Sequence, residues 1–167
     1  PRGLDPVQTV KPPRVEADVT VDGVLDEPAW QQAAALTGFS QYAPVDGRPA
    51  ESQTSVLVWY SPTALYFGIR AQAPAGSVRA TLSNRDRIDT DDQIQIYLSP
   101  FNDGRQALMF AVNPLGVQAD GALVEGTRGS GAFSGLNTGR ESADLSPDFV
   151  FQSKGRLTDE GFEIEVR

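Results

Sequence analysis

Four aspartates crowd one short stretch of the chain and are the residues best suited to hold a metal ion. They are Asp86, Asp89, Asp91 and Asp92. Calcium prefers several hard oxygen ligands, which carboxylates supply. The spacing is not that of an EF-hand loop, and nearby arginines could instead neutralise the same carboxylates: Arg85, Arg87 and Arg105. Two interpretations stay open, a calcium site or an ion-paired surface, so calcium is a candidate ligand and no cofactor is required.

Catalytic side chains are scarce. The sequence contains no histidine and no cysteine. This excludes a serine–histidine triad, a cysteine nucleophile, a disulfide and a thiolate zinc site. Asp120 and Glu125 are the one carboxylate pair to weigh for glycoside hydrolysis, but the adjoining Gly- and Ser-rich stretch fixes no separation between them. We therefore expect the chain not to be an enzyme.

The composition and net charge of the chain limit the classes of partner that it could bind. The chain has 167 residues, enough for one domain with a real core, and its net charge is −8. Phosphate recognition needs clustered lysine and arginine, so nucleic acid is not an expected partner. The simpler interpretation of the acidic surface is that it keeps the protein soluble. The more specific alternative is that some of its carboxylate clusters bind cations.

The N-terminal part predicts an extended arm followed by a strand and a helix. Residues 1–14 carry four prolines and predict the arm, ahead of a domain over residues 15–167. Alternation over residues 17–21 predicts a strand. A short helix is expected at about residues 26–36, with Asp26 as its cap, and Trp30 packing it onto the sheet.

Alternation of apolar and polar residues dominates the rest of the chain and predicts strands. The segments are 56–60, 65–70, 93–98, 105–112, 117–123, 149–157 and 161–166. A stretch rich in Gly and Ser, residues 126–147, predicts a long loop. Many short strands joined by turns are typical of an all-β, antiparallel two-sheet β-sandwich of immunoglobulin or jelly-roll type, here with one short N-terminal helix.

The order of several motifs resembles the family 9 carbohydrate-binding modules. Val-Asp-Gly-Val-Leu-Asp-Glu-Pro-Ala-Trp, at 21–30, is similar to the opening of that family, and 56–69 is similar to its next hairpin. Arg-Asp at 85–86, followed by the strand at 91–98, continues the likeness. Phe-Ala-Val-Asn-Pro-Leu-Gly, at 110–116, resembles a subgroup placed N-terminal to bacterial outer-membrane β-barrel proteins of unknown function.

The resemblance implies a sugar site that this chain lacks in part. Sugar-binding members hold the sugar between two tryptophans, one just ahead of the strand at 94–98, where this chain has Ile88. The second has no counterpart before Arg167. Trp59 and Tyr97 are then the candidate ligand contacts, although the central strand around Trp59 favours core packing. The family also implies structural calcium.

These observations favour a non-catalytic accessory or interaction domain of a bacterial cell-envelope protein. Its expected partner is the attached outer-membrane β-barrel, and its expected location is the outer membrane, on either side, or outside the cell. The alternative is a genuine carbohydrate-binding module for a polysaccharide. Because the alternating pattern runs up to Arg167 without a turn, we also expect the domain to be truncated at its C-terminal end.

Overall fold

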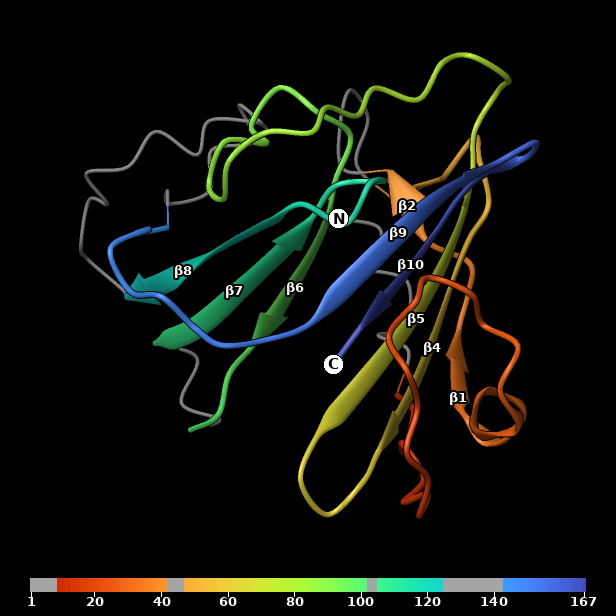
Figure 1. Ribbon diagram of the computed structural model, residues 1–167, viewed down its shortest axis with the longest axis vertical. Coiled ribbons are helices and arrows are strands. Elements are labelled where there is room, and N and C mark those ends of the chain that lie inside the picture. Colours follow the sequence, from red (N-terminus) through yellow and green to blue (C-terminus); the bar gives the residue numbers. More distant parts are fainter. Residues whose placement is uncertain (1–8, 42–46, 102–104, 125–142) are drawn as a thin grey trace.

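The described part of the chain folds into antiparallel sheets with one short helix (Figure 1). The computed structural model describes residues 9–41, 47–101, 105–124 and 143–167. The larger sheet has the order β1 (Ala34–Leu36), β4 (Thr54–Tyr60), β5 (Leu65–Gln72), β10 (Gly161–Val166) and β9 (Ser153–Thr158). The smaller sheet has the order β6 (Ile94–Leu98), β7 (Gln106–Val112) and β8 (Gln118–Val124), and β2 (Ser40–Gln41) pairs with β3 (Arg48–Pro49). The predicted all-β sandwich is confirmed.

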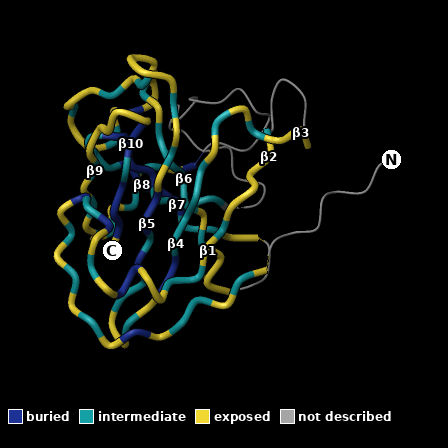
Figure 2. Tube along the Cα trace, turned by 90° about the vertical axis from the view of Figure 1, so that its right-hand side faces the viewer, coloured by how far each residue is buried: buried dark blue, intermediate teal, exposed yellow. Residues whose placement is uncertain are grey.

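The core between the two sheets follows from the alternation along the strands. In β10, Phe162, Ile164 and Val166 point toward the smaller sheet and pack with Ile69 of β5 and Val112 of β7. Figure 2 shows how the buried residues concentrate in β5 and β10, the strands in the middle of the larger sheet. Strands buried on both faces are expected in the middle layer of a fold, so something must also cover the outer face.

One edge of the sandwich is closed by backbone contact. Gly155 of β9 lies against the turn after β7, where a Cβ atom would collide with the carbonyl oxygen of Pro114. The hydroxyl of Ser153 donates to the carbonyl oxygen of Gly116 over 2.9 Å, and the side-chain Nε2 of Gln118 donates to the Ser153 hydroxyl over 3.0 Å. The larger and smaller sheets are therefore tied together at β9, and only glycine fits at position 155.

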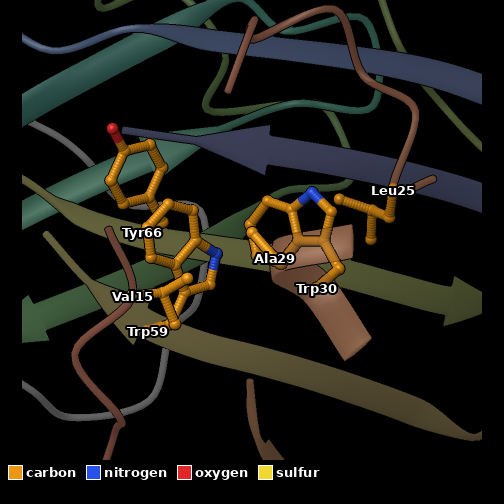
Figure 3. Packing of buried hydrophobic residues seen from close by; sticks show 6 residues of the cluster. All are labelled: Val15, Leu25, Ala29, Trp30, Trp59 and Tyr66. Atoms are coloured by element: carbon orange, nitrogen blue, oxygen red, sulfur yellow. The ribbon is translucent and has the colours of Figure 1, made fainter. Parts of the chain in front are cut away.

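The outer face of the larger sheet is covered by residues 15–33, which we call the N-terminal layer. Trp59 and Tyr66 stack with ring centroids 3.8 Å apart, and Trp30 meets Trp59 edge to face (Figure 3). The Trp59 indole nitrogen lies on the side of Trp30 and has no hydrogen-bond partner among the described residues. At Gly68, a Cβ would lie 2.9 Å from the side chains of Leu25 and Trp30, so glycine lets the N-terminal layer approach the sheet.

The expected helix over residues 26–36 is wrong in type and extent. The structure has a 3-10 helix, η1 (Pro28–Gln32), with Glu27 rather than Asp26 at its N-cap and no side-chain cap. Its closing bond runs from the Ala33 amide to the Trp30 carbonyl, three residues back. The chain then turns extended because β1 pairs with β4, and this pairing outweighs the helix preference of its alanines. Trp30 is buried against the sheet, as expected.

Other boundaries also differ. The strand expected at residues 17–21 is not formed, since this segment packs on the sheet without pairing to it. The last part of the expected arm is fixed to the sheet by an isolated backbone β-bridge between Arg14 and Tyr60 at the end of β4. Most of the expected loop at 126–147, and residues 1–8 of the arm, lie outside the described residues. No helix in the described part of the chain has the length and apolarity needed to cross a membrane.

Candidate functional site

The two candidate ligand contacts lie apart, on different sheets. Trp59 is 0% exposed and belongs to the cluster under the N-terminal layer, so its ring packs in the core and offers no face to a ligand. Tyr97, on β6 of the smaller sheet, is 39% exposed, and its hydroxyl donates to the Gln95 side-chain oxygen over 2.6 Å. Ile88, at the place where the resemblance described above implies a tryptophan, is fully buried against the smaller sheet.

The four aspartates expected to bind calcium do not converge on one point. The Asp91 carboxylate accepts hydrogen bonds from the Thr81 amide and from the Asn113 amide group, each within 2.9 Å. Burial raises the pKa of Asp91, but these hydrogen bonds outweigh it and hold the pKa below its ordinary value. Asp92 accepts from the Arg79 amide over 2.8 Å. Both carboxylates therefore hold the loop ahead of β6 in place.

Asn113 is the centre of that loop's hydrogen-bond network. It is 0% exposed, and its amide group donates to the Thr81 carbonyl and the Asp91 carboxylate, both over 2.8 Å. Its side-chain oxygen accepts from the amides of Leu115 and Val117 over 3.0 and 2.9 Å. The Asn113 side chain thus makes the two donated and two accepted hydrogen bonds that an asparagine can make. Because the residue is buried, a substitution that leaves one of these partners unpaired would cost folding free energy.

Asp86 instead meets two aspartates from other parts of the chain. One oxygen of each of Asp86, Asp120 and Asp148 lies within 4.8 Å of the others. Asp86 adopts a positive φ of 63°, and its carboxylate accepts from the Asp120 amide over 3.1 Å. Burial raises the pKa of Asp86, aided by the charge of Asp120, beyond what that hydrogen bond and Arg85 take back. Asp89 is exposed and outside this cluster.

Arg85 neutralises part of the negative charge of the Asp86, Asp120 and Asp148 cluster. Its guanidinium Nε donates to the buried Asp120 carboxylate over 2.8 Å, and Asp148 lies 3.9 Å from the same nitrogen. The second oxygen of Asp120 accepts from the Phe149 amide. A calcium ion at this place would share Asp120 with Arg85, so the fit for the metal rests on Asp86 and Asp148. Glu125, the other carboxylate weighed for glycoside hydrolysis, lies outside the described residues.

A groove of about 550 Å³ opens beside the part of the larger sheet that the N-terminal layer covers. Its residues come from the ends of β4, β5 and β10 and from segments 37–39 and 49–50. Across its floor, Ser55, Arg70 and Glu163 lie in register on neighbouring strands. Arg156 pairs with Glu163 on the next strand, β9, outside the lining of the groove. Phe39, 42% exposed, belongs to its wall.

Glu163 is held between two arginines. Arg70 Nε donates to one carboxylate oxygen over 2.8 Å, and Arg156 donates to the other over 3.0 and 2.6 Å. Burial raises the pKa of Glu163, but the hydrogen bonds and charges of the two arginines outweigh it, so the pKa is lowered. Glu163 is therefore ionised at neutral pH and fixes both guanidinium groups.

A second glutamate on β10 has the opposite environment. Glu165 is fully buried under the N-terminal layer, where one carboxylate oxygen accepts from the amides of Asp22 and Gly23 over 2.9 and 3.1 Å. The other oxygen has no partner among the described residues. Burial raises the pKa of Glu165 to about 7, and the charges of Glu27 and Asp22 act in the same direction.

No protein-family model matches the sequence. No curated protein matches it either. Among solved structures, the chain is similar to a family 9 carbohydrate-binding module from Caldicellulosiruptor kristjanssonii, in complex with cellotriose, with a TM-score of 0.58 and 15% identity. The match covers 93% of this chain and 66% of that module. The chain therefore has the fold of a family 9 carbohydrate-binding module and spans about two thirds of that protein's length.

Sequence reasoning missed several residues of these sites. Asp148, Phe39, Arg70 and Glu163 were not singled out, because each reaches its site through strand pairing or chain crossing rather than local spacing. A signal was available for one pair: Arg70 and Glu163 are charged residues on the outward positions of two well-patterned strands, and the register places them side by side.

Proposed function

We propose that this chain is a non-catalytic accessory domain of a bacterial cell-envelope protein, acting by contact rather than by chemistry. The observation that carries the proposal is the fold shared with a carbohydrate-binding module over 93% of the chain. The lack of histidine and cysteine supports it. Asp120, the described member of the weighed carboxylate pair, supports it too, because both of its oxygens are engaged by Arg85 and Phe149.

The contact we favour is with the outer-membrane β-barrel to which such a domain would be attached. The two sheets part at one end into an opening of about 390 Å³, lined by apolar side chains that include Phe67, Ile96, Phe110 and Phe151. Val150 at its rim is fully exposed. Apolar surface rimmed by polar groups is typical of a protein contact.

A polysaccharide is the second candidate partner. The similar module from Caldicellulosiruptor kristjanssonii was solved with cellotriose, and this chain has an open groove with polar and aromatic walls. With Ile88 buried where the resemblance implies a tryptophan, sugar would be bound here without the aromatic sandwich. An envelope location, outer-membrane associated or secreted, is compatible with either partner and is part of the proposal.

Calcium is proposed as a structural ligand only. The residues that would hold it are chiefly Asp86 and Asp148, whose carboxylate oxygens converge with that of Asp120, which Arg85 already engages. Calcium would supply charge neutralisation and cross-link the loop ahead of β6 to β8 and to the segment before β9.

The test has two parts. Incubation with a panel of polysaccharides is expected to release no reducing sugar, and release by the wild-type chain that is lost in Asp120→Asn would overturn the proposal. A photo-crosslinker at Val150, in the protein that carries this domain, is expected to trap the barrel. Leu82, 84% exposed and outside the opening, is the matched control position. Crosslinks from Leu82 alone would contradict the proposed contact.

A further inference from the structure

The middle of the N-terminal layer, residues 16–24, is bonded to the larger sheet at one point, and we call this segment the latch. Its amides at Asp22 and Gly23 donate to the same carboxylate oxygen of Glu165 over 2.9 and 3.1 Å. Among the described residues, these are the only hydrogen bonds between the latch and the two sheets. One carboxylate therefore decides whether the latch is bonded to the sheet.

The latch is fixed at both ends and has open space beside it. Before it, the Val15 amide donates to the Tyr60 carbonyl over 2.9 Å, and after it, Arg70 donates to the Leu25 carbonyl over 3.2 Å. A groove of about 480 Å³ lies between residues 19–21 and the strands β8 and β9. This arrangement leaves the latch room to lift from the sheet while both of its ends stay in place.

The closed latch favours the neutral form of Glu165. The side chain is fully buried, and its second carboxylate oxygen has no partner in the described part of the chain. Burial raises the pKa of Glu165 to about 7, and the charges of Glu27 and Asp22 add to the effect, whereas the two amide bonds oppose it. An ionised Glu165 under the closed latch is therefore costly, because a buried charge needs full pairing.

An alternative partner for the ionised carboxylate stands on the next strand. Lys154 of β9 lies directly opposite Glu165 in the register, on the same face of the sheet. Gly23 of the closed latch covers this pair, since a Cβ there would lie 3.4 Å from the Cβ of Lys154. Lys154 forms no ion pair with any described residue. Lifting the latch would let the two opposite charges meet.

The other charged groups around Glu165 leave Lys154 as its one unpaired cationic neighbour. From β5, the residue opposite Glu165 is Gly68, which brings no charge. The remaining acids of the N-terminal layer are exposed: Glu16, Asp18 and Asp26. The charged residues on the same face of β10 and its neighbours have partners of their own: Glu163 with Arg70 and Arg156, and Arg167 with Tyr66.

We propose that the latch is a pH-dependent cover, closed while Glu165 carries a proton and lifted when the ionised carboxylate exchanges the amides of Asp22 and Gly23 for Lys154. Lifting would uncover the outer face of β10 and the part of the aromatic cluster on which Ala17 and Val19 pack. This movement goes beyond the accessory role proposed above and does not depend on the partner of the domain.

The direction of the pH effect follows from the pKa of Glu165 in the two states. In the open state the carboxyl is hydrated and has its ordinary pKa of 4.5, against about 7 in the closed state. The ratio of open to closed latch therefore rises with pH between these two values and levels off above about pH 7. From pH 5 to pH 8, these values give an increase of about 70-fold.

The test is amide hydrogen exchange of the chain between pH 5 and pH 8, corrected for the intrinsic exchange rates. The protection factors of the Asp22 and Gly23 amides should fall by about 70-fold in the wild type. At every pH they should stay below that of the Ile164 amide in β10, because lifting the latch is a local opening. Glu165→Gln cannot ionise, so its protection factors should stay constant. Glu163→Gln, on the same face of β10, is the matched control and should keep the wild-type change.

Lys154→Met tests the open state and does not depend on whether Glu165→Gln folds. It should raise the protection of the Asp22 and Gly23 amides at pH 8 by about threefold, the effect of losing one exposed ion pair from the open state. Equal protection in Lys154→Met and wild type would overturn the pairing with Lys154. Wild-type protection that is constant with pH, or that equals that of Ile164 throughout, would overturn the latch itself.

Discussion

Replacing Glu165 with glutamine is expected to change how the stability of the domain depends on pH. The folded-state pKa of Glu165 is raised from 4.5 to about 7, because the carboxyl is buried under the N-terminal layer. Between these two values the folded chain keeps a proton that the unfolded chain releases. Stability from this group is therefore fully present below about pH 4.5 and is lost as pH rises through about 7.

The size of the effect follows from the two pKa values. They differ by about 2.5, and one pKa unit corresponds to about 1.4 kcal/mol, so the wild type should lose about 3 kcal/mol across this window. Glutamine keeps an oxygen to accept from the amides of Asp22 and Gly23 and cannot ionise. The stability difference between Glu165→Gln and wild type should therefore move in favour of the variant by that amount from pH 4.5 to pH 8.

Urea unfolding at several pH values between 4.5 and 8 measures this difference directly, and comparison with wild type cancels the other titrating groups. Glu163→Gln is the control on the same strand. In the wild type the pKa of the Glu163 carboxyl is lowered, so the stability that Glu163 contributes is complete above about pH 4.5. That stability is lost only as pH falls below this value. A difference for Glu165→Gln that stays constant with pH would refute the reasoning, because it would mean that the carboxyl ionises normally in the folded chain.

Three further changes test other parts of the structure. Gly155→Ala should destabilise by about 3 kcal/mol in urea unfolding, since the added Cβ meets a backbone carbonyl that cannot move alone, and an unchanged midpoint would count against the close packing. Asn113→Asp should cost about 2–4 kcal/mol at neutral pH and less in acid, because a carboxylate would face Asp91; equal loss at both pH values would disprove this repulsion. Calcium should raise the melting temperature of the wild type and of Asp89→Asn but not of Asp86→Asn, and no shift in any of the three would remove the proposed metal.

The strands could be predicted from the sequence because their alternation is a local property. The range expected for β10, residues 161–166, matches the structure, and its apolar residues face the core as its pattern indicated. Strict alternation with these apolar residues places Glu165 on the opposite face of the sheet. It does lie on the outer face, but the N-terminal layer covers that face, so the residue is buried. Alternation reports the side of a sheet and carries no information about a further layer.

The candidate sites could be predicted only in part, because their residues meet through tertiary contacts. Asp86 was singled out for its neighbours in sequence, but the structure brings it to Asp120 and Asp148, which lie 34 positions or more away along the chain. The prediction of a helix over residues 26–36 was wrong for a related reason. The alanines in this range favour a helix in isolation, and pairing of β1 with β4 decided their conformation.

The N-terminal layer has a consequence for the order in which the domain can be completed during synthesis. The amide of Asp22 is held by Glu165, 143 residues later, and β10 lies between β5 and β9 in the larger sheet. As the chain leaves the ribosome, the N-terminal layer can pack on the β4–β5 hairpin first. Strand β10, which carries Glu165 and fills the place between β5 and β9, is synthesised last. Until then β5 presents an unpaired edge and an apolar face. A nascent chain of this domain should therefore need protection from aggregation until β10 has emerged.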